Sequence, residues 1–445
     1  PEQFTLHQSS YVVVWDYNDP IWPQLVLEAP CDIQCIEFNP SEPKILVGGL
    51  VNGQIILWNL DDANRPEQSV IDMMGREKLP SQIRSLPYRQ LSLIEASHDG
   101  PVYAIRWINN KVFNDSGELV SHPTTDQFLT TSSDGRLLVW DKNEEFVLPS
   151  KKAIKIKSER LRGKWIPVNT WNVWKLDNSA PLSICSMDYV PDTGVYLGTQ
   201  DGEFVLADIG PIARKSSLLD DEHGGYKTFN NLTVAKSIHQ KHYSAVHTVQ
   251  VHPQFSDIVL TIGSHEIHIW KCGCHCPIWT SPFRESYLTS GTWSPTRPGV
   301  LFIGRHDGIM EAWNFMDKSH SPSLEHVVYQ NVELSSIQFL KAQTQYSQFL
   351  AVGTSQGVLH VMEVPRNLSK VSPNEADAMR KFFDRESQKV HYYERRFEFH
   401  KKNAEEMKRA FKGSMEDGGT DAKSNNNNKN QQEGELTQEK KMELE

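Results

Sequence analysis

The sequence predicts an all-β protein, a seven-bladed β-propeller, followed by one long C-terminal α-helix and a disordered polar tail. Three observations predict this: a strand unit that recurs seven times, a tight turn at a fixed place in each unit, and a heptad pattern near the C-terminus. Repeated strand units cannot bury their faces alone, so they must pack on one another. The predicted boundaries are 1–365 for the propeller, 373–412 for the helix and 413–445 for the tail.

Each repeat ends at a tryptophan-type position that follows a tight-turn pair by about six residues. The clearest copies run from Asn52 to Trp58 and from Asp134 to Trp140. Their Asn-Gly and Asp-Gly pairs favour hairpins, because both turn residues tolerate positive φ. The seven positions are Trp15, Trp58, Trp140, Ala207, Trp270, Trp313 and Met362. We expect burial between the blades, where large aromatic side chains fill the core, for Trp58, Trp140, Trp270 and Trp313.

The strands before each turn also follow a pattern. The first strand ends in an aromatic or β-branched residue, often followed by x-Pro, as at Phe38. The second strand ends in small residues, such as Gly48, which permit close packing near the crowded centre of the ring. In the third repeat 33 positions separate Trp107 from Trp140, which predicts an insertion around 110–126.

The first repeat is predicted to be clipped at its N-terminus. Only its second strand, around 4–7, and its third strand, around 11–15, can be recognised, so we expect its inner strand upstream of Pro1. The chain turns helical soon after Met362, which leaves little room for an outermost strand on the last blade. We expect upstream residues to supply that strand too and so to close the ring.

Composition restricts the classes of function. The net charge is −10, with +5 over 366–412 and −11 over 1–365. An acidic body disfavours nucleic-acid binding, which needs basic charge against phosphates. No apolar run approaches the roughly 18–20 residues that a membrane span needs. Six cysteines are too few for a disulfide framework in a chain of 445 residues, which favours a reducing compartment such as the cytoplasm.

Three motifs resemble catalytic, phosphate-binding or zinc-binding sites but lack the spacing or the local structure that such sites need. Residues 353–357 spell a nucleophile elbow, yet their last two residues fill a hairpin turn between blade strands. Residues 223–228 lack the spacing that wraps phosphates. Residues 272–276 hold three cysteines and a histidine without the usual C-x₂₋₄-C zinc spacing or an evident second ligand pair. We therefore predict a protein that is not an enzyme and has no catalytic, cofactor-binding or metal-binding residues.

The predicted helix opens with a strong start signal, in which Ser372 can cap and Glu375 completes a capping box. Apolar residues then alternate at spacings of three and four over about five heptads, until Gly413 offers a stop. Such a helix needs a partner for its stripe. That partner is either the helix's own propeller or another protein, and both readings stay open. The candidate partner-binding residues are Met379, Phe383, Val390, Tyr393, Phe397 and Met407.

A basic segment at 151–165 holds seven Lys or Arg residues and one acidic residue. One reading is an outer edge strand, where lysine blocks aggregation. The other is an electrostatic dock for an acidic partner. The candidate residues for such a dock are Lys151, Lys152, Lys155, Arg160 and Arg162.

The number and spacing of the repeats resemble the WD-repeat family over about 1–365. Several family marks are degenerate, because Trp15-Asp16 and Trp140-Asp141 are the only Trp-Asp pairs. Within that family the chain looks like the axonemal dynein intermediate chains, closest to intermediate chain 3 of the inner-arm type. The most specific signature is 38–55, which fits the phrase x-N-P-x-x-P-x-x-L-x-G-G-x-x-N-G-x-(I/V).

The resemblance implies a non-catalytic scaffold subunit of an inner-arm dynein motor, located at the axoneme of a cilium or flagellum. The implied partners are the tail of a dynein heavy chain, on which the propeller docks, and other intermediate and light chains. It implies no nucleic-acid or membrane partner and no cofactor. The alternative that stays open is another WD-repeat scaffold, such as an intraflagellar-transport or ubiquitin-ligase adaptor.

Overall fold

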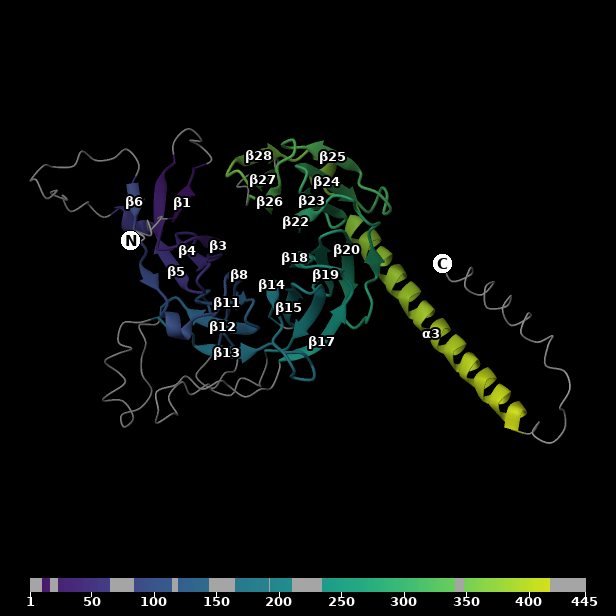
Figure 1. The fold of residues 1–445 in the computed structure, drawn as a ribbon. Helices are drawn as coiled ribbons and strands as arrows, with labels where there is room; N and C mark the ends of the chain where they lie inside the picture. Colours follow the sequence, from purple (N-terminus) through teal and green to yellow (C-terminus); the bar gives the residue numbers. More distant parts are fainter. Residues whose placement is uncertain are drawn as a thin grey trace, which may run out of the picture. The chain divides into compact units, whose positions relative to one another are not determined.

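Seven β-sheets succeed one another around a ring in the first part of the chain (Figure 1). This arrangement confirms the predicted seven-bladed propeller. Contacts divide the chain into two units, Pro1–Asp384 and Arg385–Glu445. The computed structural model describes residues 10–16, 23–64, 84–113, 119–143, 165–191, 193–209, 234–340 and 348–416.

Blades two to six each contain four strands in an antiparallel meander, with the first strand nearest the centre of the ring (Figure 1). Blade two holds β3 (Ile33–Phe38), β4 (Ile45–Leu50), β5 (Ile55–Asn59) and β7 (Gln90–Leu91). Blade three holds β8 (Val102–Trp107), β11 (Gln127–Ser132), β12 (Arg136–Asp141) and β13 (Asn169–Asn172). Blade four holds β14 (Ile184–Val190), β15 (Gly194–Thr199), β16 (Glu203–Ala207) and β17 (Ala235–Gln240). Blade five holds β18 (Val246–Val251), β19 (Ile258–Gly263), β20 (Ile267–Lys271) and β21 (Trp279–Thr280), and blade six holds β22 (Leu288–Trp293), β23 (Val300–Arg305), β24 (Ile309–Asn314) and β25 (Leu324–Val327).

Blades one and seven each show three strands among the described residues. Blade seven holds β26 (Leu334–Phe339), β27 (Phe349–Thr354) and β28 (Leu359–Glu363), and the short helix α2 (Arg366–Ser369) follows. In blade one, β1 (Ser10–Val14) pairs antiparallel with β2 (Leu25–Ala29), which pairs parallel with β6 (Arg84–Leu86). Since β1 leads into Trp15, it is the third strand of its repeat, as predicted. The second strand predicted around 4–7 lies outside the described residues.

The predicted insertion of the third repeat is a small antiparallel hairpin, formed by β9 (Lys111–Phe113) and β10 (Leu119–Ser121). Two 3₁₀ turns, η1 (Leu60–Asn64) and η2 (Ile94–Ala96), accompany blade two and the approach to blade three. None of these elements interrupts the four-stranded sheets beside them.

The tryptophans expected between blades are buried: Trp58, Trp140 and Trp313 are 0% exposed and Trp270 is 2% exposed. Trp15, at the end of β1, is 46% exposed instead. The buried positions explain the small residues on the second strands. A Cβ atom at Gly48 would lie only 2.9 Å from the Trp58 ring, so a larger residue there would collide with it.

A chain of hydrogen bonds fixes Trp140 to its blade. Trp140 Nε1 donates to Thr130 Oγ1 at 2.9 Å, and the same hydroxyl lies 2.9 Å from His98 Nε2. The other ring nitrogen, His98 Nδ1, lies 3.0 Å from the carboxylate of Asp134. Burial alone would raise the pKa of Asp134, but the hydrogen bond and charge of His98 hold it well below the usual range. The turn residue and the blade core are therefore linked by one polar path.

Blade five has the same path without its carboxylate. Trp270 Nε1 donates to Thr261 Oγ1 at 2.9 Å, and His242 Nε2 lies 2.8 Å from that hydroxyl. Ser264 stands where the equivalent turn residue would be Asp, and the ring of His268 lies 4.2 Å from that of His242. Burial lowers the pKa of His242 to about 3 and that of His268 to about 4.

The neutral state of His242 predicts a pH dependence of stability. The ordinary pKa of a histidine is about 6.5, so at about pH 5 His242 is protonated in the unfolded chain. In the folded chain His242 is not protonated at that pH. Stability should therefore fall as the pH drops from 6.5 toward 3. We expect His242→Gln to flatten the dependence of the unfolding free energy by about 1.4 kcal/mol per pH unit. Urea titrations between about pH 5 and 6.5 measure the dependence of the unfolding free energy on pH. His320→Gln, at an exposed histidine, serves as the control. The same pH dependence in the wild type and in His242→Gln would contradict the prediction.

Polar side chains on the innermost strands link neighbouring blades. They stand directly before the aromatic residue near the end of their strand, as Glu37, Arg106 and Asp188 do before Phe38, Trp107 and Tyr189. Burial alone would lower the pKa of Arg106, but the carboxylates of Glu37 and Asp188 raise it above its ordinary value. The links across blades two to six are Arg106–Glu37 at 3.5 Å, Arg106–Asp188 at 3.3 Å, Val251 N–Asp188 at 2.7 Å and Trp293 N–Gln250 at 2.8 Å.

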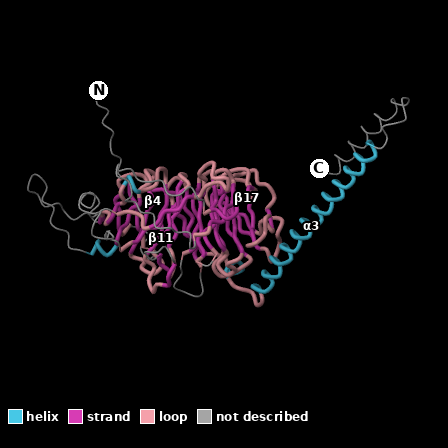
Figure 2. Tube along the Cα trace, turned by 90° about the horizontal axis from the view of Figure 1, so that it is seen from below, coloured by secondary structure: helices cyan, strands magenta, loops and turns pink. Residues whose placement is uncertain are grey.

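The C-terminal helix α3 runs without interruption from Glu375 to Glu416 (Figure 2). A C-terminal helix was predicted over 373–412, but the observed helix continues through Gly413. A glycine inside a helix costs about 1 kcal/mol relative to alanine, which weakens the helix without ending it. Within the described residues, no helix is both long and apolar enough to cross a membrane.

Candidate binding surfaces

The first ten residues of α3 belong to the propeller unit and are tied to blade six by a buried ion pair. Arg297 Nε donates to both oxygens of the Glu375 carboxylate, at 2.9 and 3.1 Å. Arg297 Nη1 also donates to the carbonyl oxygen of Asn367. The backbone N–H of Ser372 donates to Glu375 at 3.0 Å, which is the glutamate half of the predicted capping box. One carboxylate therefore binds both the backbone just before α3 and the propeller.

Two apolar side chains of this helix segment complete the attachment. Met379 and Phe383 are both 0% exposed and lie in a core cluster with residues of blades five and six, including Trp293 and Trp313. We call residues 366–384 the anchor. The first two members of the predicted partner-binding stripe are thus part of the propeller's own core.

Charged pairs at the margin of the anchor reinforce it. Lys271 Nζ lies 2.6 Å from Asp384 Oδ1, and the hydrogen bond from that ammonium lowers the pKa of Asp384. Arg380 lies 2.6 Å from Asp257 and stacks over the ring of Phe255, with its guanidinium carbon 5.3 Å from the ring centre. Because these groups are partly exposed, each pair contributes at most about 1 kcal/mol.

The second unit carries the remaining stripe residues. Val390 is half-buried, whereas Tyr393, Phe397 and Met407 are 58, 72 and 75% exposed. The structure therefore divides the six predicted residues into a buried pair on the propeller and four on the helix beyond Asp384. It also shows exposed aromatic side chains that the sequence prediction did not include, Tyr392 and Phe399.

The basic candidates lie outside the described residues. They are Lys151, Lys152, Lys155, Arg160 and Arg162. The same holds for the phosphate-loop-like stretch at 223–228.

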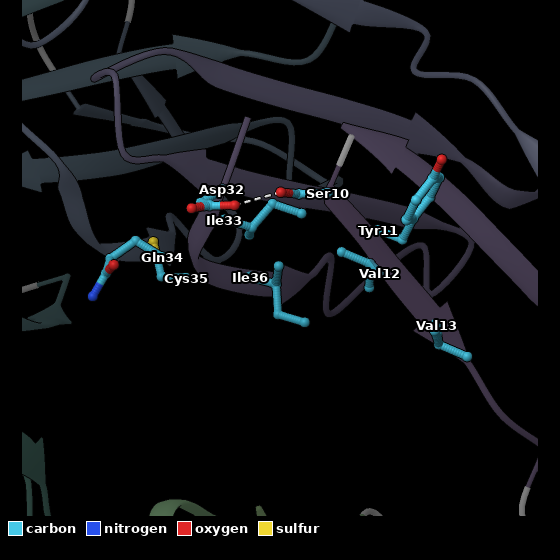
Figure 3. A pocket seen from close by; sticks show the side chains of 9 residues that line it. All are labelled: Ser10, Tyr11, Val12, Val13, Asp32, Ile33, Gln34, Cys35 and Ile36. Atoms are coloured by element: carbon cyan, nitrogen blue, oxygen red, sulfur yellow. Dashed lines mark hydrogen bonds between the residues drawn. The ribbon is translucent and has the colours of Figure 1, made fainter. Parts of the chain in front are cut away.

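A pocket of about 600 Å³ lies between β1 and β3 (Figure 3). Its apolar lining is partly exposed, as Ile36 at 46% and Tyr11 at 56% show. Among the described residues no strand pairs with the edge of β1 that faces away from β2. The complete blades carry their first two strands at this place, so the pocket marks the incomplete part of blade one. It is lined by Ser10, Tyr11, Val12, Val13, Asp32, Ile33, Gln34, Cys35 and Ile36.

The chemical-looking motifs lie in ordinary turns. Gly357, at the end of the apparent nucleophile elbow, has φ of +79° in the hairpin between β27 and β28. Cys272 is exposed just after β20, and its sulfur lies 2.8 Å from the hydroxyl of Tyr196. Across the ranges that the structure describes, no three His, Cys, Asp or Glu side chains are grouped to hold a metal ion.

The propeller blades, taken together, match a known protein family. A family model described as "Dynein axonemal intermediate chain 3 WD40 domain" matches residues 3–172 and 169–364, which is most of the chain. The chain belongs to this WD40 domain family. The resemblance found in the repeats is therefore confirmed, and so is the WD-repeat nature of the propeller.

Individual relatives of this WD40 domain agree. Dynein axonemal intermediate chain 3 of Homo sapiens is 27% identical over 88% of this chain and 51% of its own length. The 70 kDa intermediate chain of the flagellar outer arm of Chlamydomonas reinhardtii is 25% identical over 85% of this chain and 54% of its own length. The chain thus spans about half the length of the curated relatives it matches. A solved chain titled "Crystal Structure of Mitotic Checkpoint Complex" is 13% identical with a TM-score of 0.47, covering 74% of this chain and 73% of that chain.

Sequence reasoning missed the residues of the WD40 propeller that hold the helix. Arg297 follows the x-Pro pattern of the sixth repeat and carries no motif of its own. Two signals were available in the sequence: an arginine after a strand end that has no place in the repeat pattern, and a stripe in which Met379 and Phe383 precede a charged interruption at Glu386. Neither signal says which blade the helix contacts.

Proposed function

We propose that the chain is a non-catalytic scaffold subunit of an axonemal dynein motor of the inner-arm type. In this proposal it works in the cytoplasm at the axoneme of a cilium or flagellum. The observation that carries it is the family match over both halves of the propeller. The relatives' names support an axonemal dynein subunit, and they include ciliary and outer-arm chains. The inner-arm assignment rests on the resemblance of the repeats to the inner-arm type alone.

The proposal divides the work between two parts of the chain. The propeller docks on the tail of a dynein heavy chain, and the exposed part of α3 contacts a further protein through Val390, Tyr393, Phe397 and Met407. The inter-blade links and the buried tryptophans support a rigid docking platform. The exposed aromatic residues beyond Asp384 support a second, separate contact, because isolated helices gain little stability without a partner for their apolar face.

Affinity purification of the full-length protein from ciliated cells tests the proposal. We expect a dynein heavy chain and other intermediate and light chains to co-purify, and a version that ends at Asp384 to retain the heavy chain. An unrelated WD-repeat protein of the same cells serves as the control. Recovery of intraflagellar-transport or ubiquitin-ligase components without any heavy chain would favour the alternative scaffold class.

A further inference from the structure

Beyond the interruption at Glu386, the helix keeps a regular heptad spacing from Val390 to Met407. Successive residues on one side of α3 are three and then four positions apart, which is the spacing of the core positions of a coiled coil. We call this line the seam. All its members are apolar except His400, and those near the middle, such as Phe397, are largely exposed. The seam consists of Val390, Tyr393, Phe397, His400, Ala404 and Met407.

Charge is distributed unequally around the seam. The positions that border a seam decide the choice of partner in coiled coils. Here four of the six are basic and one is acidic: Lys389, Glu394, Arg396, Lys401, Asn403 and Lys408. At the positions that face away from the seam the charges cancel, because three residues are basic and three are acidic. They are Arg395, Lys402, Arg409, Glu398, Glu405 and Glu406. Positive charge is therefore concentrated along the two borders of the apolar line.

We propose that the seam binds an α-helix of another protein that carries apolar residues in heptad spacing and acidic residues on both borders. The inference deepens the second contact of the proposed function and rests on it. Binding would bury Tyr393 and Phe397 and place carboxylates opposite Arg396, Lys401 and Lys408. These charges set the choice and orientation of the partner more than its affinity.

A second copy of the same helix, paired in parallel, fits the seam poorly. In a parallel pair, each border residue faces the residue five positions further along the other helix. Lys389 would then meet Glu394 favourably, but Arg396 would meet Lys401, and like charges at these positions oppose pairing. His400 adds a polar group in the middle of the seam, a position where a single polar residue selects register and partner number.

Two synthetic helical peptides of equal length serve as probes of the full chain. Both carry Ile and Leu at heptad positions, one with Glu and the other with Lys at every border position. We expect the Glu peptide to bind about tenfold or more tightly than the Lys peptide, and the difference to shrink in high salt. Replacing Arg396, Lys401 and Lys408 with Glu should reverse the preference.

Matched aromatic variants test the seam itself. Phe397 and Phe399 are 72 and 61% exposed on the same helix, but Phe399 lies off the seam. Phe397→Ser should weaken binding of the Glu peptide by about tenfold, whereas Phe399→Ser should change it by less than about twofold. Circular dichroism and the melting temperature verify that both variants keep the fold.

Several results would overturn the inference. They are equal affinity for the two peptides, no binding of either, equal losses in both aromatic variants, or a dimer in sedimentation that Phe397→Ser dissolves. The last result would assign the seam to a second copy. Since the heavy chain is scored separately by co-purification, loss of the peptide preference leaves the proposed function standing, and loss of the heavy chain leaves the seam measurement intact.

Discussion

Trp140→Ala is expected to lower the free energy of unfolding of the propeller by about 3–5 kcal/mol. Trp140 is fully buried, and its ring meets that of Trp165 edge to face, with centres 5.3 Å apart. The substitution leaves a cavity between blades and removes the donor to Thr130 Oγ1, which then keeps only its contact with His98. Denaturant unfolding followed by tryptophan fluorescence and circular dichroism measures the loss.

The matched control for this prediction is Trp15→Ala. Trp15 holds the equivalent position in blade one but is 46% exposed, so its removal should cost less than about 1 kcal/mol. A near-neutral shift for Trp140→Ala, or equal losses for the two variants, would show that the inter-blade core does not depend on the tryptophan as the packing indicates.

Glu375→Ala is expected to release the anchor at a local cost of about 3–5 kcal/mol, because it leaves the guanidinium of Arg297 buried without its partner. Arg297 and Glu375 have side chains 8% and 0% exposed, so water cannot easily replace the lost carboxylate. The variant also loses the acceptor for the Ser372 N–H at the start of α3. We expect faster amide exchange over 375–384, with little change in blades two to four.

Asp257→Asn provides the comparison, since it breaks the more exposed pair with Arg380 in the same anchor. Its effect should stay below about 1 kcal/mol. If amide exchange over 375–384 is unchanged in Glu375→Ala, the buried pair does not hold the helix. If instead every blade is destabilised together, the anchor is not a separate cooperative segment.

Periodic features of the sequence were sufficient to predict the propeller. Every blade packs against its neighbours in the same way. The same residues therefore recur in each repeat, such as the turn pair Asp134-Gly135 and the tryptophan six residues after Asp134, and a single pattern predicts seven units. The third-repeat insertion and the helix start near Ser372 were also readable, because both are local. The helix end was not, since continuation through Gly413 depends on the residues around it rather than on the glycine alone.

Departures from the repeat pattern and contacts of the helix could not be predicted in this way. Blade six holds Trp313 Nε1 with Glu311 rather than with a threonine, and Arg305 offsets that buried charge at 3.2 Å. Nothing in the repeat pattern predicts this exchange. The division of the helix stripe likewise depends on where Met379 meets blades five and six, and heptad spacing is the same on either side of Asp384.

The place of the anchor decides how the propeller responds to mechanical tension. A pull on the chain beyond Asp384 reaches the 366–384 segment before it can reach β28 at the end of blade seven. The part of that segment nearest Asp384 is held on blades five and six by a buried ion pair and two buried apolar side chains, and Leu368 at its start is buried with residues of blades six and seven. Among the described residues blade seven has three strands. A load transmitted by the helix therefore reaches the complete blades five and six before it reaches blade seven.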